Sequence, residues 1–311
     1  MAVDVVLAGD RKILWGLAVT VRSALEHASE PLNIHVLATG FRPGDERALR
    51  QSWQHDKCGA VTFYTISSDR TKRFRSTHYL KSKAAYSRYF ISALPEHIER
   101  CVYLDTDLLV FKDLSEIHKI DLGSNIAAAV RDISVRTRGA WPELRERLGV
   151  ENEMNYVNSG VIIIDLARWR QDDVETALVE ISISKFDQLD SQDQDAINIV
   201  LYDKIACLDI SWNLSQYEKP EIGKANIIHL IGSVKPWHAR YRSKTGDVYF
   251  DQVLRSFFAI LDRTAYRGHR PWNPFGAGSL LEKLVSHIPT LDMATGKMRR
   301  SVKRFVAGRA G

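Results

Sequence analysis

The chain has 311 residues, of which 45% are hydrophobic and 26% charged, as in a soluble globular protein with a sizeable core. It contains no run of 18 or more apolar residues and no leader with a charged start, so the sequence predicts neither a membrane-spanning helix nor a signal peptide. Its three cysteines are too widely spaced for a disulfide framework or a metal cluster, which favours a reducing cytoplasm.

The formal net charge of +5 is unevenly distributed along the chain. The last fifteen residues contain no acid and six bases, which together exceed the whole net charge: Lys297, Arg299, Arg300, Lys303, Arg304 and Arg309. The rest of the chain is close to neutral. This argues against a general surface for nucleic acid and predicts that none is bound.

Strand-like and helix-like segments alternate through the first half of the chain. Apolar runs predict strands at residues 3–8, 34–38, 60–66 and 101–104. Helical patterns follow the first strand, begin again at Pro43, and cover residues 79–94. This alternation predicts βαβ units and therefore an α/β fold with a mostly parallel sheet. Such sheets bind ligands beyond the carboxyl ends of their strands, which is where Asp10 and Asp105 stand.

The second half of the chain is less regular. Apolar runs predict strands at residues 125–130, 160–166 and 225–231, and a helix is predicted at 191–201. The polar stretch 132–155 reads as a long loop, a kind of segment that is usually functional or mobile. A breaker-rich segment begins at Arg270. We therefore expect a nucleotide-sugar-binding catalytic domain over residues 1–265, followed by a linker and basic segment over 266–311.

The strongest single motif places Asp105 and Asp107 directly after an apolar strand. In extended backbone, residues i and i+2 point to the same side, so these two carboxylates would repel each other. A divalent cation removes that repulsion, and oxygen ligands favour Mg²⁺ or Mn²⁺ over softer metals. The alternative interpretation is an ordinary solvated turn at the end of a strand.

A second motif begins at His229, after the predicted strand 225–231, and is expected at the carboxyl edge of the sheet. The imidazole of His229 could complete a carboxylate metal site, and its nitrogen favours Mn²⁺ over Mg²⁺. Gly232 would allow the backbone to approach a ligand closely, and Lys235 could neutralise a phosphate. The alternative is a core histidine and a surface lysine around a turn.

Two further segments allow two interpretations each. At the start of the predicted helix 191–201, Ser191 and Gln194 fit a capping box. Alternatively, Asp193 and Gln194 face a pocket from the rigid start of that helix. Asn158 precedes a predicted strand, either as part of a site or as an ordinary turn residue.

In this order, the motifs resemble those of the family-8 retaining glycosyltransferases, which include bacterial lipopolysaccharide galactosyl- and glucosyltransferases and glycogenin. The resemblance covers roughly residues 3–240 and rests on six segments: Leu7-Ala-Gly-Asp10, Tyr86-Ser-Arg88, Leu104-Asp-Thr-Asp107, Asn158-Ser-Gly160, Asp193-Gln-Asp195 and His229…Gly232…Lys235-Pro-Trp237. It implies a single Rossmann-like domain of the GT-A type. This domain would bind a UDP-sugar donor and Mn²⁺, or Mg²⁺ in its place.

The resemblance also implies roles for individual residues. The metal ligands would be Asp105, Asp107 and His229. The donor's nucleoside would be met by Ala8, Asp10, Ile13 and Thr106, with Asp107 near the ribose. The pyrophosphate would be held by Gly232 and Lys235. The donor sugar would be surrounded by Arg88, Asp132, Asn158, Asp193 and Gln194. Among these, the catalytic set would be Arg88, Asp193 and Gln194.

Members of the family retain anomeric configuration, so the resemblance implies an α-linked product from an α-configured donor. Gln194 would stand on the far face of the sugar, either as a weak amide nucleophile or as a stabiliser of an oxocarbenium-like centre. One position departs from the family pattern, because relatives usually carry an aromatic residue where this chain has Ile13. An aliphatic side chain gives up base stacking of about 1–3 kcal/mol. UDP remains the expected nucleotide.

Near the C-terminus, apolar residues recur at helical spacing among the basic ones: Met298, Val302, Phe305 and Val306. A basic amphipathic helix of this kind predicts attachment to an anionic membrane surface, where each basic residue contributes roughly 1 kcal/mol. Relatives of the lipopolysaccharide type carry similar tails. The resemblance therefore implies a cytoplasmic protein on the inner face of the cytoplasmic membrane. The alternative is a disordered basic terminus without that role.

Together, these features predict a retaining, metal-dependent hexosyltransferase that moves galactose or glucose from a UDP-sugar to a lipid-linked or lipopolysaccharide-type saccharide. Two other classes of protein are also compatible with the sequence. A nucleotidyltransferase would use an α/β sheet and acidic metal ligands too, although residues 7–12 make a poor phosphate loop. A membrane-peripheral module could also bind a nucleotide sugar without catalysis.

Overall fold

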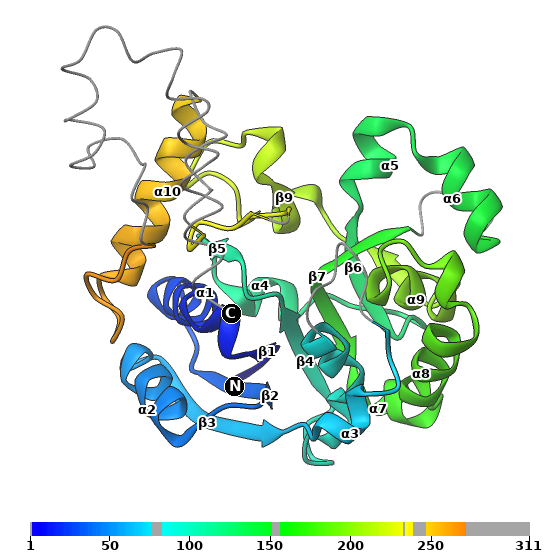
Figure 1. Cartoon of the computed structure of the whole chain (residues 1–311), viewed down its shortest axis with the longest axis horizontal. Helices are drawn as coiled ribbons and strands as arrows, with labels where there is room; N and C mark the ends of the chain where they lie inside the picture. The colour runs from blue at the N-terminus through cyan, green and yellow to red at the C-terminus, as the bar shows by residue number, and fades with distance from the viewer. Residues whose placement is uncertain (1, 76–82, 151–155, 233, 239–246, 272–311) are drawn as a thin grey trace, which may run out of the picture.

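The computed structural model describes residues 2–271, except 76–82, 151–155, 233 and 239–246. Within this part, a seven-stranded sheet forms the centre and helices cover both of its faces (Figure 1). None of the described helices is both long and apolar enough to cross a bilayer. The predicted amphipathic tail at residues 298–306 lies outside the described residues, and the domain boundary at 265 stays a prediction.

The strands belong to two sheets. They are β1 (Val3–Asp10), β2 (Leu32–Thr39), β3 (Cys58–Thr65), β4 (Arg100–Leu104), β5 (Leu108–Val110), β6 (Ala127–Arg131), β7 (Val157–Asp165), β8 (Ile205–Cys207), β9 (Leu214–Ser215) and β10 (Ile227–His229). The predictions for the first half of the chain are confirmed to within two residues at each strand end. The sequence did not predict the short strands β5, β8 and β9.

The α-helices are α1 (Leu14–Glu26), α2 (Pro43–Ser52), α3 (Ser68–Thr71), α4 (Leu114–His118), α5 (Ile133–Arg138), α6 (Trp141–Leu148), α7 (Leu166–Gln171), α8 (Val174–Ser184), α9 (Asp193–Val200) and α10 (Val248–Leu261). Short 3₁₀ helices join them: η1 (Arg11–Ile13), η2 (Lys83–Ala93), η4 (Phe186–Gln188), η5 (Ile210–Asn213) and η6 (Gln216–Glu218). The predicted helices after β1, at Pro43 and at 191–201 are confirmed as α1, α2 and α9.

The main sheet has the order β3-β2-β1-β4-β7-β6-β8. The pairs β3–β2, β2–β1, β1–β4 and β6–β8 are parallel, which confirms the predicted, mostly parallel α/β fold. Only β7 runs against its neighbours β4 and β6. The start of β7 therefore lies at the carboxyl end of β4, where the Asp105 amide donates to the Gly160 carbonyl at 2.7 Å.

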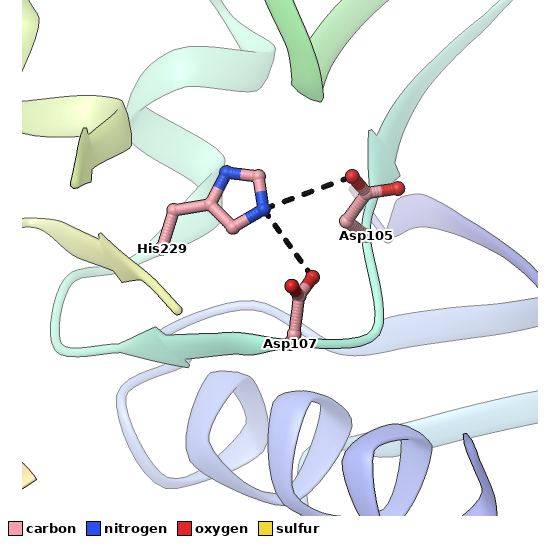
Figure 2. Close-up of side chains that lie close together, drawn as sticks. All are labelled: Asp105, Asp107 and His229. Atoms are coloured by element: carbon pink, nitrogen blue, oxygen red, sulfur yellow. Dashed lines mark ion pairs between the residues drawn. The ribbon is translucent and has the colours of Figure 1, made fainter. Parts of the chain in front are cut away.

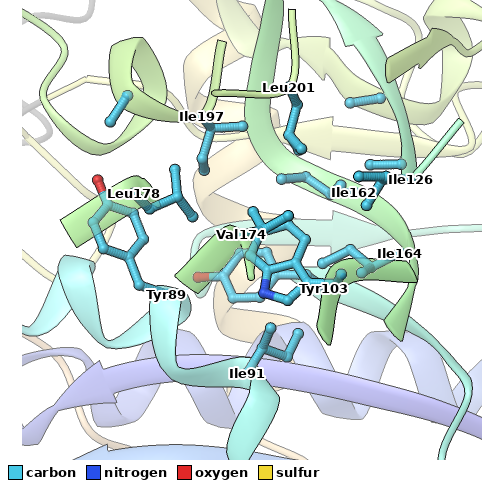
Figure 3. Packing of buried hydrophobic residues seen from close by; sticks show 14 of the residues in the cluster. Tyr89, Ile91, Tyr103, Ile126, Ile162, Ile164, Val174, Leu178, Ile197 and Leu201 are labelled. Carbon is cyan, nitrogen blue, oxygen red and sulfur yellow. The ribbon is translucent and has the colours of Figure 1, made fainter. Parts of the chain in front are cut away.

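Alternation along the strands divides the core between the two faces of the sheet. Val5 and Leu7 of β1 pack toward α1, α2 and α4, whereas Val6 and Ala8 pack toward η2, α8 and α9. Figure 3 shows this second face, where Tyr103 of β4 lies beside side chains of β7, α8 and α9. Because both faces are covered, the ends of the strands are the part of the sheet left to build a site.

The predicted strand 225–231 forms β10, but this strand does not join the main sheet. It pairs antiparallel with β5 and parallel with β9 in a separate three-stranded sheet. Strand β5 follows β4 after only three residues, and His229 pairs with Leu108. His229 thus lies at the carboxyl end of β4, as the sequence predicted. It is placed there by the second sheet, whereas the sequence predicted that its strand belongs to the main sheet.

The predicted helix 79–94 is a 3₁₀ helix, η2, over its described part, with a kink at Phe90. Side chains three residues apart lie above one another in a 3₁₀ helix. Tyr86 and Tyr89 therefore face the same side, and both rings contact Phe74, at centroid distances of 4.2 and 5.7 Å. The apolar pattern of the sequence predicted a helix here but did not indicate the 3₁₀ type.

The loop predicted over 132–155 is wrong for its described residues, which form α5 and α6. Asp132 caps α5 by accepting from the Ser134 amide at 2.8 Å. Gly139 and Gly149 end the two helices with φ of 62° and 71°, a left-handed conformation that glycine adopts without strain. Asp132, Gly139 and Gly149 are typical cap residues and could have predicted these helices from the sequence. The stretch was interpreted as a loop because its composition is polar.

Two of the alternative interpretations, both based on local turn chemistry, are wrong. The predicted strand 160–166 begins earlier, at Val157, so Asn158 is a strand residue and not part of a turn. Helix α9 has no capping box, because its N-cap is Gln192 and not Ser191. Instead, the buried carboxylate of Asp195 accepts locally from the Ser191 amide at 3.0 Å, and its tertiary contacts with Arg147 and Tyr156 hold the start of this helix.

Asp195 is fully buried and accepts from Arg147 at 2.8 Å and from the Tyr156 hydroxyl at 2.5 Å. We expect Asp195→Ala to lower the free energy of unfolding by about 3–5 kcal/mol, because it leaves buried partners unpaired. Urea denaturation measures this loss. The matched control is Asp190→Ala, since Asp190 is 66% exposed and lies 3.4 Å from the same arginine. That change should cost less than about 1 kcal/mol; equal losses would contradict the prediction.

Candidate functional site

The three predicted metal ligands lie together at the carboxyl end of β4 (Figure 2). Asp105 follows β4, Asp107 precedes β5, and His229 ends β10. Each offers one ligand atom, and these atoms lie within 4.8 Å of one another. His229 Nε2 is 3.3 Å from Asp107 Oδ1 and 3.8 Å from Asp105 Oδ2. Two carboxylates and an imidazole nitrogen form a donor set that fits a divalent cation such as Mn²⁺.

Lys235 supplies positive charge to the same cluster. Its Nζ donates to Asp107 Oδ2 and to the Leu230 carbonyl, the latter at 2.8 Å. Burial alone would raise the pKa of Asp107, but the charge of Lys235, together with the side-chain contacts of Lys235 and His229, outweighs it and holds this pKa well below its usual range. Asp107 is therefore ionised, the form that a metal or an ammonium group requires.

Two glycines make room for this cluster. A Cβ on Gly160 of β7 would lie 2.2 Å from His229 Cε1, so only glycine lets the imidazole pack against that strand. A Cβ on Gly16 of α1 would lie 2.2 Å from the Thr106 carbonyl. Glycine inside a helix costs roughly 1 kcal/mol relative to alanine, and here it permits α1 to approach the turn between the two aspartates. The sequence reasoning missed Gly16.

The predicted donor-sugar residues form a second cluster around Arg88 of η2. This guanidinium is 9% exposed and bonds Asp105 Oδ1 at 2.7 Å and Asp193 Oδ2 at 3.0 Å. It also donates to the Ser159 carbonyl and hydroxyl at 3.0 and 2.9 Å. Burial would lower the pKa of Arg88, but the two carboxylates raise it above its ordinary value. Arg88 thus stays charged and joins the two clusters.

For Asp193, at the start of α9, the effect of burial on the pKa outweighs the effect of its charged partner, whereas for Arg88 the charged partners outweigh burial. Burial raises the pKa of its carboxyl, although Arg88 opposes that effect and Asp105 adds to it. The side chain is a carboxylate enclosed by protein, held by one charged partner. It can present a directed charge to a ligand with little competition from water.

Asp132, Asn158 and Gln194 form the rest of the second cluster. Asp132 Oδ2 accepts from Asn158 Nδ2 at 3.0 Å and from Gln194 Nε2 at 3.2 Å. Gln194 Oε1 accepts from Asn158 Nδ2 at 3.0 Å and from the Ser159 amide at 3.3 Å. Tyr156, which the sequence reasoning did not single out, accepts from Gln194 Nε2 at 3.3 Å. These contacts hold the amide of Gln194 in one orientation.

The four residues predicted to meet the nucleoside lie on β1, on η1 and in the turn after β4. Ala8 is buried in β1, and Asp10 caps η1 by accepting from the Lys12 amide at 2.8 Å. Ile13 lies over Gly9, where an added Cβ would meet its Cδ1 at 2.1 Å. Thr106 is in the turn after β4, the strand next to β1. These residues therefore share the sheet edge on which the clusters stand.

Gly232 and Lys235 were predicted to hold a pyrophosphate. Gly232 has φ of 118°, a conformation that side chains other than glycine rarely adopt. A Cβ there would also lie 2.8 Å from the Tyr217 hydroxyl. The segment after β10 is held by Gln216 Nε2, which donates to the Ile231 carbonyl at 2.8 Å. Backbone strain and close packing thus favour glycine beside the metal-ligand cluster.

Comparison with known proteins bears on the same residues. The family model described as glycosyl transferase family 8 matches residues 4–240, which include both clusters. General stress protein A of Bacillus subtilis (strain 168) is 26% identical over 284 residues, or 85% of this chain and 91% of that protein. Lipopolysaccharide 1,2-glucosyltransferase of Escherichia coli (strain K12) is 26% identical over 246 residues, covering 74% and 71% of the two chains.

Among solved structures, the galactosyltransferase LgtC, in complex with donor and acceptor sugar analogs, has the same fold. The TM-score is 0.72 at 22% identity, over 84% of this chain and 96% of that chain. This likeness supports the GT-A type of fold that the motifs implied. With the family model matched over most of its length, the chain belongs to glycosyl transferase family 8.

Proposed function

We propose that this protein is a metal-dependent, retaining hexosyltransferase that moves galactose or glucose from a UDP-sugar to a saccharide acceptor. The observation that carries the proposal is the convergence of Asp105, Asp107 and His229 within 4.8 Å, beside the ammonium group of Lys235. The names of similar proteins, a lipopolysaccharide 1,2-glucosyltransferase and a galactosyltransferase, support the choice of hexose and of a lipopolysaccharide-type acceptor.

The charge of the leaving group accounts for the composition of the metal-ligand cluster, which consists of Asp105, Asp107 and His229 with Lys235 beside them. When the glycosidic bond breaks, its electron pair goes to the diphosphate. A divalent cation held by Asp105, Asp107 and His229 would neutralise that charge. Lys235, which pairs with Asp107 in the structure, would donate to a phosphate oxygen instead. Gly232 would let the backbone approach the same oxygens.

The second cluster would hold the donor sugar. Asp193 and Arg88 present a buried carboxylate and guanidinium that can bind sugar hydroxyls. Gln194 Oε1 already accepts two hydrogen bonds, which favours stabilisation of an oxocarbenium-like centre over attack by its amide oxygen. The acceptor hydroxyl would then bond to the anomeric carbon from the leaving-group side and give its proton to the diphosphate, so configuration is retained.

Two further parts of the proposal concern the nucleoside and the cell membrane. Uracil would pack near Ile13, with Ala8, Asp10 and Thr106 along the same sheet edge. The basic segment over 266–311 would attach the protein to the inner face of the cytoplasmic membrane, beside a lipid-linked acceptor. No nucleic acid is expected to bind.

Donor hydrolysis tests the metal site. We expect the wild type with Mn²⁺ to release UDP slowly from one member of a panel of UDP-sugars. EDTA or Asp107→Asn should lower that rate by roughly 100-fold or more, because the diphosphate loses its main source of stabilisation. The control is Asp203→Asn, an exposed aspartate outside both clusters. Release of pyrophosphate from UTP and a sugar 1-phosphate would instead support a nucleotidyltransferase. Tight binding of a donor that stays intact with acceptors would support a non-catalytic module.

Lys235→Met separates metal binding from phosphate binding. Without UDP, we expect Mn²⁺ to bind up to about tenfold more tightly, because the ammonium no longer competes for Asp107. UDP affinity in the presence of Mn²⁺ should fall by about tenfold, since a charge-assisted hydrogen bond is lost. Electron paramagnetic resonance of Mn²⁺ measures both effects. The control is Lys224→Met, whose side chain is 74% exposed; weaker Mn²⁺ binding in Lys235→Met alone would contradict the proposed competition.

A further inference from the structure

We infer that Asn213 is a positioning residue that keeps His229 in the tautomer able to bind a metal. Asn213 stands at the end of η5, and its Oδ1 lies 3.0 Å from His229 Nδ1. In the neutral imidazole, a proton on that nitrogen leaves a free lone pair on Nε2, which faces Asp105 and Asp107. The inference rests on the proposed metal site and adds to it the group that prepares the imidazole.

The orientation of Asn213 follows from contacts whose direction is certain. The main-chain amide of Gly160 can only donate, and it meets Asn158 Oδ1 at 3.0 Å. The Nδ2 of Asn158 faces the carboxylate oxygen Asp132 Oδ2 at 3.0 Å. These two contacts fix the orientation of the Asn158 amide: its oxygen faces the Gly160 amide and its nitrogen faces Asp132.

Asn158 Oδ1 also accepts a hydrogen bond from Asn213 Nδ2 at 2.8 Å. A reversed Asn213 amide would place two carbonyl oxygens at that distance, with no proton between them. The amide oxygen of Asn213 must therefore point to His229, and an acceptor at this position requires Nδ1 to carry the proton. One chain of hydrogen bonds thus runs from Asp132, in the donor-sugar cluster, to the metal-ligand imidazole.

Burial makes this orientation costly to change. Asn213 is 2% exposed and His229 is 5% exposed, so water has little access to replace a lost partner. The imidazole is also confined by Gly160, as described above. The turn that carries Asn213 is held by Asp209, which caps η5, and by Asn226, which donates to Ser211 Oγ at 2.8 Å. Asn213 is therefore placed by side-chain contacts of Asp209 and Asn226 that do not involve His229.

The tautomer can be measured in the metal-free protein by two-bond ¹⁵N–¹H correlation spectra. These spectra distinguish imidazolium from the two neutral tautomers, and the signals of the neutral ring decide the question. In the wild type we expect the proton of His229 on Nδ1, and a proton on Nε2 would overturn the inference without any variant. In Asn213→Leu, which removes the acceptor, we expect loss of this preference.

Mn²⁺ binding in the presence of UDP gives the second readout. Loss of an outer contact to a metal-binding histidine typically costs 10–100-fold in affinity, so we expect that loss in Asn213→Leu. Asn213→Asp keeps an acceptor for Nδ1–H but loses the donor to Asn158 Oδ1, so we expect it to lose less affinity than Asn213→Leu. The control is Asn226→Leu, which removes a hydrogen bond from the same turn without touching His229.

These outcomes separate the inference from the proposed function. Wild-type affinity in Asn213→Leu, or an equal loss in Asn226→Leu, would show that Asn213 has only a structural role. If the wild type bound no Mn²⁺, the proposed metal site would be wrong, while the tautomer of His229 would still test the part played by Asn213. Should Asn213→Leu fail to fold, the wild-type spectrum and Asn213→Asp still decide the question.

Discussion

The structure depends on compensating three carboxylates that stand together at the end of a buried strand. Asp105, Asp107 and Asp193 would each cost several kcal/mol if they were enclosed without partners. Arg88 bonds both Asp105 and Asp193, and Lys235 pairs with Asp107. Because these two cations neutralise only part of the charge of three carboxylates, the site keeps a negative charge that favours binding of a divalent metal.

Rigid elements hold these charges in place. Both aspartates of the Asp-Thr-Asp turn are fixed between β4 and β5, and Arg88 is held by Ser159 of β7. The antiparallel run of β7 is what brings Ser159 and Asn158 to the carboxyl end of β4. A parallel strand in that position would have placed them at the opposite edge of the sheet. The direction of one strand thus decides which side chains the site contains.

Apolar periodicity predicted the strands and helices of the first half of the chain well, because burial on the two faces of a sheet leaves a regular trace in the sequence. It misread the described part of the stretch, residues 132–150, as a loop, and it did not indicate that residues 83–93 form a 3₁₀ helix. Short helices closed by Asp132 and by glycine caps carry little periodic signal. Tyr86 and Tyr89 of η2 pack against the ring of Phe74, a contact that forms only in the folded chain.

The sequence by itself determined the α/β class, the family resemblance and the identity of the charged residues, since strand ends and motif order are local properties of the chain. The tertiary structure alone decided that His229 reaches Asp105 through a second sheet, and that Gly16 and Gly160 leave room for the cluster. It also revealed Asn213, whose spacing from His229 carries no motif. Contacts between residues far apart along the chain depend on strand direction and close packing, and neither is written in the local pattern of residues.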